Sequence, residues 1–371
     1  MSANKKQKYG YELPVPADVD LDPEAVGAYS ELDMPTTVAA AEEWQAQHDI
    51  QPVEDDEVVI TTTIIDNQGD FDLSADAEGA RLSIGPKAIT DLIALLAFIY
   101  TNLRVISKMV VTLDTHFLSQ IFHPFFWVSA ADGKTHPAPF TAILPHQVGD
   151  DPSKGHLWKP NPAMCFIVMG KKNTPANYAA LLRYAQFYCA ELGKRNKPPL
   201  VIWPYHCRLG SKGATLVPSL MRALDFFEVS RWSKVIYRIK GSNALTEAYS
   251  PFGDEVTQYN KTKIGEESDA VIQDLLDSDV LIIAGQALSH CVRAAIYDIL
   301  NKILQQDPEL AKKVYILIDA TSPVPGFEQQ AKDAVADFKS HGMNIVTTDT
   351  PIIEWPNLSA KVRSWLQKQA A

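Results

Sequence analysis

The hydrophobic positions of this chain alternate between short β-branched runs and longer segments with helical spacing. Runs typical of parallel strands buried on both faces occur at 58–66, 107–116, 234–239, 280–285, 313–319 and 344–348. Apolar residues at helical spacing occur at 86–103, 173–193, 218–228, 291–298 and 328–341, and from residue 358 onwards. Strands that alternate with helices predict an α/β fold with three α/β/α layers around a mostly parallel, six-stranded, Rossmann-like sheet.

Two stretches do not follow this alternation. Residues 1–56 are rich in Pro, Asp, Glu and Ala, and we predict an N-terminal arm, either a loose tail or a segment that wraps the domain or a neighbouring subunit. Residues 57–371 form the predicted domain, with an insertion at about 117–198 that is rich in proline and aromatic residues. Long irregular loops in compact domains are often lids. We expect the insertion to cover the mouth of a site; the alternative is packing on the flank of the domain or on a partner subunit.

The composition is that of a globular protein and disfavours nucleic acid as a partner. The 371 residues are 46% hydrophobic and 21% charged, with a formal net charge of -11 and no basic cluster that could neutralise a run of phosphates. The N-terminus has no apolar signal core, and no uncharged apolar run reaches the roughly 18 residues that span a bilayer. The four cysteines lack CxxC spacing, which suits a reducing compartment. We expect a cytoplasmic protein that binds neither membranes nor nucleic acid.

Polar residues with possible chemical roles stand at the ends of strand-like runs. The carboxyl ends of parallel strands meet at one edge of the sheet, where open α/β sheets bind ligands. Asp66 is a candidate base there, although an Asp that caps a turn is the commoner case. Asp114 and His116 would share one face of an extended chain and could form half of a metal site. A further strand-like run at 199–206 ends at His206, and Lys240 and Cys291 follow two of the other runs.

The thiol of Cys291 lies in the first turn of a helix that follows a strand and a sharp elbow at Gly285. The positive end of the helix dipole and the unpaired N–H groups of a first turn favour a thiolate and could hold an oxyanion. Most intracellular cysteines are small buried hydrophobic residues, so this thiol alone would not identify a nucleophile. The polar residues at the other strand ends support the interpretation of Cys291 as a nucleophile.

Five motifs follow one another along the chain: IIDNQGDF at 64–71, TLDTH at 112–116, WPYHCRLGSKGATL at 203–216, IKGSNALTEAYSPF at 239–252 and GQALSHCV at 285–292. Together they resemble the motifs of the isochorismatase-like cysteine hydrolases, and most closely those of nicotinamidases. In that family the corresponding segments carry the catalytic Asp, an Asp-Trp-His metal motif, a further metal-binding His, the catalytic Lys and the nucleophile. The resemblance covers roughly residues 58–350 and implies the isochorismatase-like hydrolase fold.

The resemblance implies a catalytic triad of Asp66, Lys240 and Cys291. Asp66 would take the thiol proton, the thiolate would attack an amide carbonyl to form a thioester, and Lys240 would favour both charged groups. Backbone N–H groups of Ala287 and Cys291 would stabilise the oxyanion. We therefore expect an amidase that cleaves a small carboxamide to the acid and ammonia, nicotinamide first, and that works as a homo-oligomer in NAD metabolism.

The resemblance also implies one divalent metal ion held by Asp114, His116 and His206. Such a donor set suits Zn, Fe or Mn, with Zn as the first choice. In the family the ion is a docking point for the pyridine nitrogen of the substrate. Phe71 matches a residue that packs on the substrate ring, and a cis peptide in the family's nucleophile loop predicts that the bond between Gln286 and Ala287 is cis.

Three departures from the family pattern keep alternatives open. Thr115 replaces the Trp of the metal motif, Ser289 replaces the Asp of the nucleophile loop, and His123 could be a further metal ligand but at a longer spacing than usual. Another small amide or an N-carbamoyl compound is therefore an alternative substrate. A binding protein that kept the fold and lost turnover is a different class, which the presence of every triad and metal residue disfavours.

Overall fold

The computed structural model describes residues 7–73, 81–195 and 197–370. It divides into two compact units, each formed by segments that lie apart in the sequence. Unit 1 consists of Met1–Leu113, Lys212–Ile239 and Asp269–Ala371, and unit 2 consists of Asp114–Ser211 and Lys240–Ser268. The sequence of unit 1 is therefore interrupted twice by unit 2.

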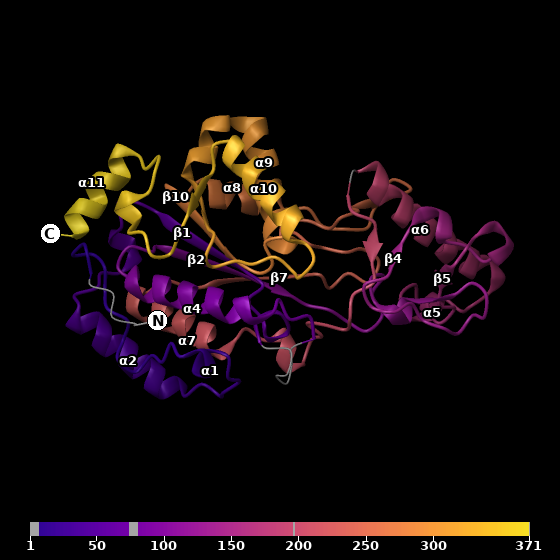
Figure 1. Cartoon of the computed structure of the whole chain (residues 1–371), viewed down its shortest axis with the longest axis horizontal. Coiled ribbons are helices and arrows are strands. Elements are labelled where there is room, and N and C mark those ends of the chain that lie inside the picture. Colours follow the sequence, from indigo (N-terminus) through magenta and orange to yellow (C-terminus); the bar gives the residue numbers. More distant parts are fainter. Residues whose placement is uncertain (1–6, 74–80, 196, 371) are drawn as a thin grey trace. The chain divides into compact units, whose positions relative to one another are not determined.

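A six-stranded sheet forms the centre of unit 1, which confirms the predicted fold (Figure 1). In spatial order its strands are β12 (Asn344–Val346), β11 (Val314–Leu317), β10 (Val280–Gly285), β1 (Ile60–Ile65), β2 (Lys108–Asp114) and β7 (Ile236–Lys240). The pairings of β1 with β10, β1 with β2, β10 with β11 and β11 with β12 are all parallel. Every residue of β1 and β10 is buried, as expected for central strands covered on both faces.

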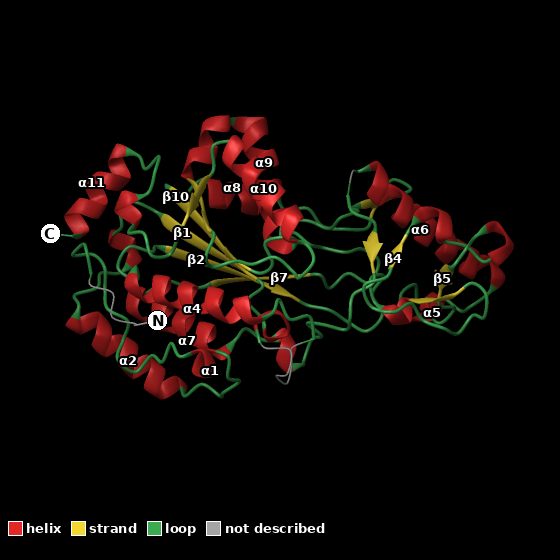
Figure 2. Cartoon of the chain, viewed as in Figure 1, coloured by secondary structure: helices red, strands yellow, loops and turns green. Residues whose placement is uncertain are grey.

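Helices cover both faces of this sheet (Figure 1; Figure 2). One face carries α4 (Pro86–Thr101) and α7 (Pro218–Arg231), and the other carries α8 (Asp269–Leu276), α9 (Cys291–Gln306) and α10 (Glu328–Ser340). The remaining helical segments of unit 1 are α1 (Pro23–Val26), α2 (Met34–Gln47), α3 (Gly69–Asp72), α11 (Ala360–Gln369) and the 3₁₀ turns Val53–Asp55, Lys212–Ala214, Pro308–Lys313 and Ile352–Glu354. Within the described parts of the chain, no helix combines the length and the apolar composition that crossing a membrane requires.

The N-terminal arm packs against the rest of unit 1. Tyr11 and Leu13 are buried in the hydrophobic core, and α2 contacts α7. The hydroxyl of Tyr11 accepts the N–H of Ile353 at 3.3 Å, which joins the arm to the C-terminal region. Tyr29, by contrast, is exposed. Residues 1–6 lie outside the described residues.

A buried ion pair fixes the end of the arm to α7. The guanidinium of Arg231 donates to the carboxylate of Asp56 at 2.6 Å and to the carbonyl oxygens of Ile106 and Gln51. The two charged side chains are 1% and 7% exposed. Burial raises the pKa of Asp56, and the neighbouring Arg231 opposes that rise. Each charge is therefore accommodated only because the other is present.

Unit 2 has a small core of its own, formed by aromatic residues of the insertion. Phe122, Phe126 and Trp127 are buried, and the indole N–H of Trp127 donates to the carbonyl of Ile121 at 2.6 Å. The elements of unit 2 are α5 (Met164–Ile167), α6 (Pro175–Lys194), the antiparallel pairs β3 (Trp127–Ser129) with β5 (Trp158–Pro160), β4 (Ala142–Ile143) with β6 (Leu200–Val201) and β8 (Gln258–Tyr259) with β9 (Thr262–Lys263), and the 3₁₀ turns Pro124–Phe126, Pro145–Gln147 and Pro152–Lys154.

The prediction of a strand over residues 199–206 is wrong about its length. Only Leu200–Val201 is a strand, and it pairs antiparallel with β4 outside the main sheet. The N–H of Ile202 still donates to the carbonyl of Thr141, but that of Trp203 donates to the carbonyl of Phe122 instead. Pro199 and Pro204 have no N–H to donate. His206 therefore comes from a loop and not from a strand end.

Replacing Arg231 with Met should lower the free energy of unfolding by about 3–5 kcal/mol, because the Asp56 carboxylate would stay buried without its cation. Chemical denaturation followed by tryptophan fluorescence measures the change. Asp56→Asn combined with Arg231→Met should recover much of the loss. Lys361→Met removes an exposed ion pair with Asp279 and is the matched control, with an expected loss below about 1 kcal/mol. Equal losses in the two single variants would contradict the assignment of a structural role to the buried pair.

Candidate active site

The carboxyl ends of β1 and β10 meet at Gly285. Ile65 lies opposite Gly285 in the parallel register, and the N–H of Gln286 donates to the carbonyl of Ile65 at 2.7 Å. Gly285 has a φ of +113°, and a Cβ there would overlap the backbone of Ile65, so only glycine permits this approach. Asp66 and the loop 286–291, which follow the two strands, are thereby held at the same sheet edge.

Asp66 is buried and has a φ of +50°, which residues with a side chain rarely adopt. Its N–H donates to the carbonyl of Thr112 at 3.2 Å, and its Oδ1 accepts the hydroxyl of Thr112 at 2.6 Å. These bonds to β2 fix both the backbone and the carboxylate of Asp66. Strained backbone that is held in this way is concentrated at functional sites, which supports the predicted role of Asp66 as the base.

Cys291 is the first residue of α9 and is 8% exposed. The loop before it folds back on itself, because the N–H groups of His290 and Val292 both donate to the carbonyl of Ala287, at 2.9 and 3.2 Å. The prediction that the peptide bond between Gln286 and Ala287 is cis is confirmed. The N–H of Ala287 has no acceptor among the residues that the structure describes, so an oxyanion could bind to it.

Ser289 ties the same loop to the segment that follows β11. Its Oγ accepts the N–H of Val324 at 3.0 Å and lies 2.8 Å from Nδ1 of His290. Burial lowers the pKa of His290 to about 4, which favours the neutral imidazole. Phe71, the predicted ring-packing residue, lies in α3 and is buried; its contact with a substrate stays a prediction.

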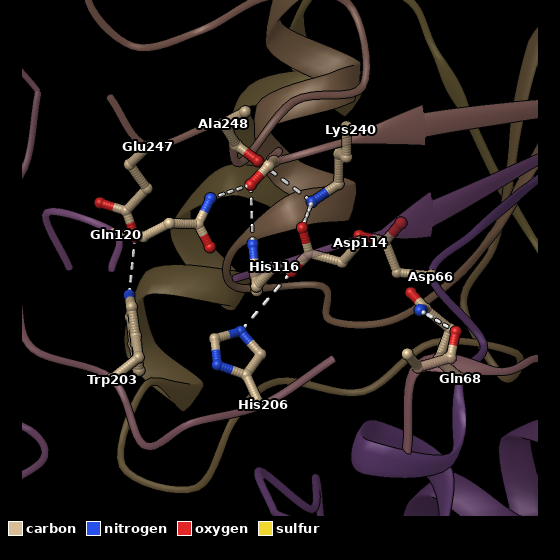
Figure 3. Close-up of polar contacts among 12 residues, drawn as sticks. Asp66, Gln68, Asp114, His116, Gln120, Trp203, His206, Lys240, Glu247 and Ala248 are labelled. Carbon is tan, nitrogen blue, oxygen red and sulfur yellow. Dashed lines mark hydrogen bonds and ion pairs between the residues drawn. The ribbon is translucent and has the colours of Figure 1, made fainter. Parts of the chain in front are cut away.

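Unit 2 brings together the three predicted metal ligands (Figure 3). One ligand atom from each of Asp114, His116 and His206 lies within 4.8 Å of the others, and all three side chains are buried. Oδ2 of Asp114 is 2.8 Å from Nε2 of His116 and 3.5 Å from Nε2 of His206. The two imidazole rings have their centroids 4.7 Å apart. These atoms converge on one position, as metal ligands do.

Backbone hydrogen bonds hold the segments that carry these side chains. The N–H of Thr115 donates to the carbonyl of Lys240, and the N–H of His116 donates to the carbonyl of Cys207, both at 2.9 Å. The carbonyl of His116 in turn accepts the N–H of Leu209 at 3.0 Å. Backbone hydrogen bonds therefore join the loop that contains His206 to His116, which follows β2.

The hydrogen bonds of the two histidines direct both Nε2 atoms toward Asp114. Nδ1 of His116 lies 2.9 Å from the carbonyl oxygen of Gly241, and Nδ1 of His206 lies 2.8 Å from that of Pro204. A carbonyl oxygen can only accept, so each Nδ1 carries a proton. Burial lowers the pKa of His116, which favours the neutral form of that ring. Two imidazole nitrogens and a carboxylate oxygen that converge in this way form a donor set that fits a divalent metal.

Lys240 binds the other oxygen of Asp114 (Figure 3). Its Nζ is 2.9 Å from Oδ1 of Asp114 and 3.0 Å from the carbonyl oxygen of Ala248, and both charged side chains are buried. Burial raises the pKa of Asp114, but the ammonium of Lys240 opposes this rise, and the pKa lies well below its usual range. The carboxylate is therefore ionised, with one oxygen on the ammonium and one facing the histidines.

His123, the candidate fourth ligand, lies beside this group. Its ring centroid is 5.8 Å from that of His116 and 6.0 Å from that of His206. Nδ1 of His123 lies 2.9 Å from the carbonyl oxygen of Phe117, and among the described residues Nε2 has no hydrogen-bond partner. Burial lowers the pKa of His123 to about 2, so its ring is neutral. The structure thus places a bare imidazole nitrogen near the cluster but outside its three-residue core.

Sequence reasoning missed two buried residues that support this site. Nε2 of Gln120 donates to the carbonyl oxygens of Gly241 and Asn243, and Glu247 accepts the indole N–H of Trp203 at 2.7 Å (Figure 3). Burial raises the pKa of Glu247 to about 8. Gln120 gave no signal in the sequence, because a single polar residue in an irregular segment has no periodicity. These three bonds tie the segment after Lys240 to residues of the 114–211 segment.

The chain is similar to known proteins in sequence and in structure. No family model matches the chain. The chain is 26% identical over 146 residues to the nicotinamidase of Saccharomyces cerevisiae, a match that covers 39% of this chain and 58% of the length of that relative. Structures similar to this one include the yeast nicotinamidase (20% identity, TM-score 0.46, 78% of this chain and 99% of that chain) and a pyrazinamidase of Pyrococcus horikoshii in complex with zinc (16% identity, TM-score 0.38, 77% and 98%).

The parallel sheet covered by helices, with polar residues at its strand ends, is the α/β architecture that the sequence predicted. The resemblance to nicotinamidases that the sequence motifs predicted agrees with the sequence match to the yeast protein.

Replacing Gly241 with Ala should weaken metal binding by about 10–100-fold, the range seen when the support of metal ligands is disturbed. Gly241 has a φ of +76°, and a Cβ there would lie 2.6 Å from Oδ1 of Asp114 and from Cε1 of His116. Metal content by mass spectrometry and zinc titration of the metal-free protein measure the loss. Gly133→Ala is the control, since Gly133 also has a positive φ but a Cβ there meets no atom within 4 Å. Equal zinc affinity in both variants would contradict the assigned site.

Proposed function

We propose that this chain is a cysteine amidohydrolase that cleaves a small carboxamide to its acid and ammonia, with nicotinamide as substrate and nicotinate as product. One observation carries the proposal: the hydrogen bond from Gln286 to Ile65 holds the base candidate Asp66 and the loop of Cys291 at one sheet edge. The sequence similarity to a nicotinamidase supports it. The proposed triad is Asp66, Lys240 and Cys291.

The proposed reaction has two stages. Asp66 takes the proton of the Cys291 thiol, and the sulfur forms a bond to the amide carbon. The N–H groups of Ala287 and Cys291 stabilise the oxyanion, a contribution of about 3–4 kcal/mol where one such donor has been removed from another enzyme. Asp66 then gives its proton to the nitrogen as the C–N bond breaks, and ammonia leaves a thioester. Water loses a proton to Asp66, attacks the thioester and releases the acid, and Asp66 returns the proton to the sulfur.

The donor set of Asp114, His116 and His206 would hold one divalent ion, and Zn, Fe or Mn suits these ligands. Such an ion, when bound, supplies a Lewis-acid position for a pyridine nitrogen, as the resemblance implies. Lys240 keeps the carboxylate of Asp114 ionised and thus able to bind a cation. We also propose a cytoplasmic homo-oligomer; the free thiols of all four cysteines support a reducing compartment.

One observation favours a second candidate substrate. Thr115 occupies the position of the family's Trp and is buried, with its N–H on the carbonyl of Lys240. The aromatic surface that a Trp would supply is therefore missing at this position. Another small carboxamide or an N-carbamoyl compound is the substrate class that this difference would admit.

An ammonia-release screen tests the proposal. It compares nicotinamide, pyrazinamide, an N-carbamoyl amino acid and a maleamate-like amide, each with and without a chelator. The highest kcat/KM is expected for nicotinamide, with loss of activity on chelation and recovery on addition of Zn, Fe or Mn. A higher kcat/KM for an N-carbamoyl compound would select the second candidate. Ammonia release from none of them would reject the amidase assignment and favour a binding protein.

Cys291→Ala should abolish hydrolysis while the free energy of unfolding changes by only about 1 kcal/mol, because the substitution removes one sulfur atom and little buried volume. Steady-state kinetics and thermal unfolding measure the two effects. Cys189→Ala, which alters a buried cysteine of α6, is the matched control and should keep parental activity. More than a trace of activity in the Cys291 variant would exclude covalent catalysis by that residue.

A further inference from the structure

A buried side chain with no role in the proposed reaction fixes the loop 285–291. Gln286 is fully buried. Its Nε2 donates to Oδ2 of Asp91 at 3.0 Å, and its Oε1 accepts the N–H of Ser322 at 3.1 Å. Asp91 lies on α4, and Ser322 lies in the segment after β11. One amide therefore ties the loop to two separate elements of unit 1.

Asp91 is an unusual residue for its position in α4. The helix buries a mainly apolar face that includes Leu92, Leu95 and Leu96, yet Asp91 on this helix is only 6% exposed. Burial raises the pKa of Asp91 to about 6, and the bonds to Ser322 and Gln286 oppose this rise. A buried polar group left without its partner costs about 1–3 kcal/mol, whereas an apolar pair of similar shape would carry no such risk. Stability alone therefore does not explain this pair.

The hydrogen bonds of Gln286 hold the peptide group between Gln286 and Ala287, whose N–H is a proposed oxyanion donor. Its own N–H binds the carbonyl of Ile65, and its two amide atoms bind Asp91 and Ser322. The N–H of Leu288 donates to the carbonyl of Ser322 at 2.9 Å. Ala287, which lies between these two residues, is therefore held on both sides, and the direction of its N–H is fixed.

We propose that Gln286 and Asp91 are positioning residues for the oxyanion site, which they serve by fixing the direction of the Ala287 N–H. The assignment rests on the proposed function, in which that N–H stabilises the oxyanion. Neither side chain touches the substrate in this assignment; both act through the loop. The direction of the Ala287 N–H matters because a hydrogen bond to an oxyanion weakens steeply when its donor is misaligned.

The test compares Asp91→Leu, Gln286→Met and the double variant with the parent. Each single variant removes one hydrogen-bond partner of the other buried polar group, so both stability and turnover should fall. The double variant removes both polar groups and should regain part of the stability, since the N–H of Ser322 still loses its acceptor. Its kcat should nevertheless stay about 10–100-fold below the parent, with KM changed less than about twofold, because only stabilisation of the oxyanion is lost. Asp91→Asn keeps an acceptor for Gln286 and should restore most of the rate.

Two further measurements separate positioning from a purely structural role. Pyridine-3-carbaldehyde should add the Cys291 S–H across its C=O bond, with no leaving group, and its affinity should fall with kcat in the double variant. Hydrogen exchange by mass spectrometry should show faster exchange for the peptide that spans 286–292 in the double variant. The matched control is Thr61→Val with Ser278→Ala, which removes another buried pair, bonded at 2.7 Å near the opposite end of β1. It should change neither kcat nor exchange at 286–292.

The outcomes distinguish this inference from the proposed function. A double variant that regains kcat and aldehyde affinity together with stability would show a purely structural role and overturn the inference. Unchanged exchange at 286–292 would overturn it as well. If the parent releases no ammonia from any carboxamide, the proposed function fails, and the exchange data still decide whether Gln286 and Asp91 fix the loop.

Discussion

The close approach of β10 to β1 at Gly285 is the constraint on which the candidate site in unit 1 depends. With any side chain at this position the strands would separate at their carboxyl ends, because a Cβ would overlap Ile65. Without that contact, Asp66 and the loop of Cys291 would lose their common anchor, and Gln286 would lose the backbone bond that orients its amide. The absence of a side chain at Gly285 therefore fixes the positions of Asp66 and of the loop that carries Gln286 and Cys291.

In unit 2 the main constraint is the burial of the Asp114 carboxylate. Asp114 is stable as an anion because the ammonium of Lys240 binds one of its oxygens, while the other oxygen faces two imidazoles. The tautomer of each imidazole is set by a backbone carbonyl that would not be available if the loops of Gly241 and Pro204 moved. The electrostatics of the site therefore depend on backbone geometry as much as on the charged residues themselves.

The sequence predicted the central strands, because β1 and β10 are short β-branched or apolar runs with no competing pattern. It also predicted which residues end those strands, since parallel topology places the ends of strands at one edge. It was wrong about the strand at 199–206, where prolines interrupt the ladder. It gave no warning of the partners of Gln286, because a contact between α4 and the loop after β10 joins residues 195 positions apart. The only signal in the sequence was Asp91, a single Asp in the apolar segment 86–103. Its role could be recognised only once the structure placed Gln286 beside it.

The bond between Tyr11 and Ile353 joins residues 342 positions apart. At the ~5–20 residues per second of ribosomal synthesis, the arm therefore emerges roughly 20–70 s before its partner. Loop closure itself adds little delay, since its entropic cost grows only slowly with length. Tyr11 therefore stays without this hydrogen-bond partner while the intervening residues are made. The bond can form only after the segment that carries Ile353 has been synthesised.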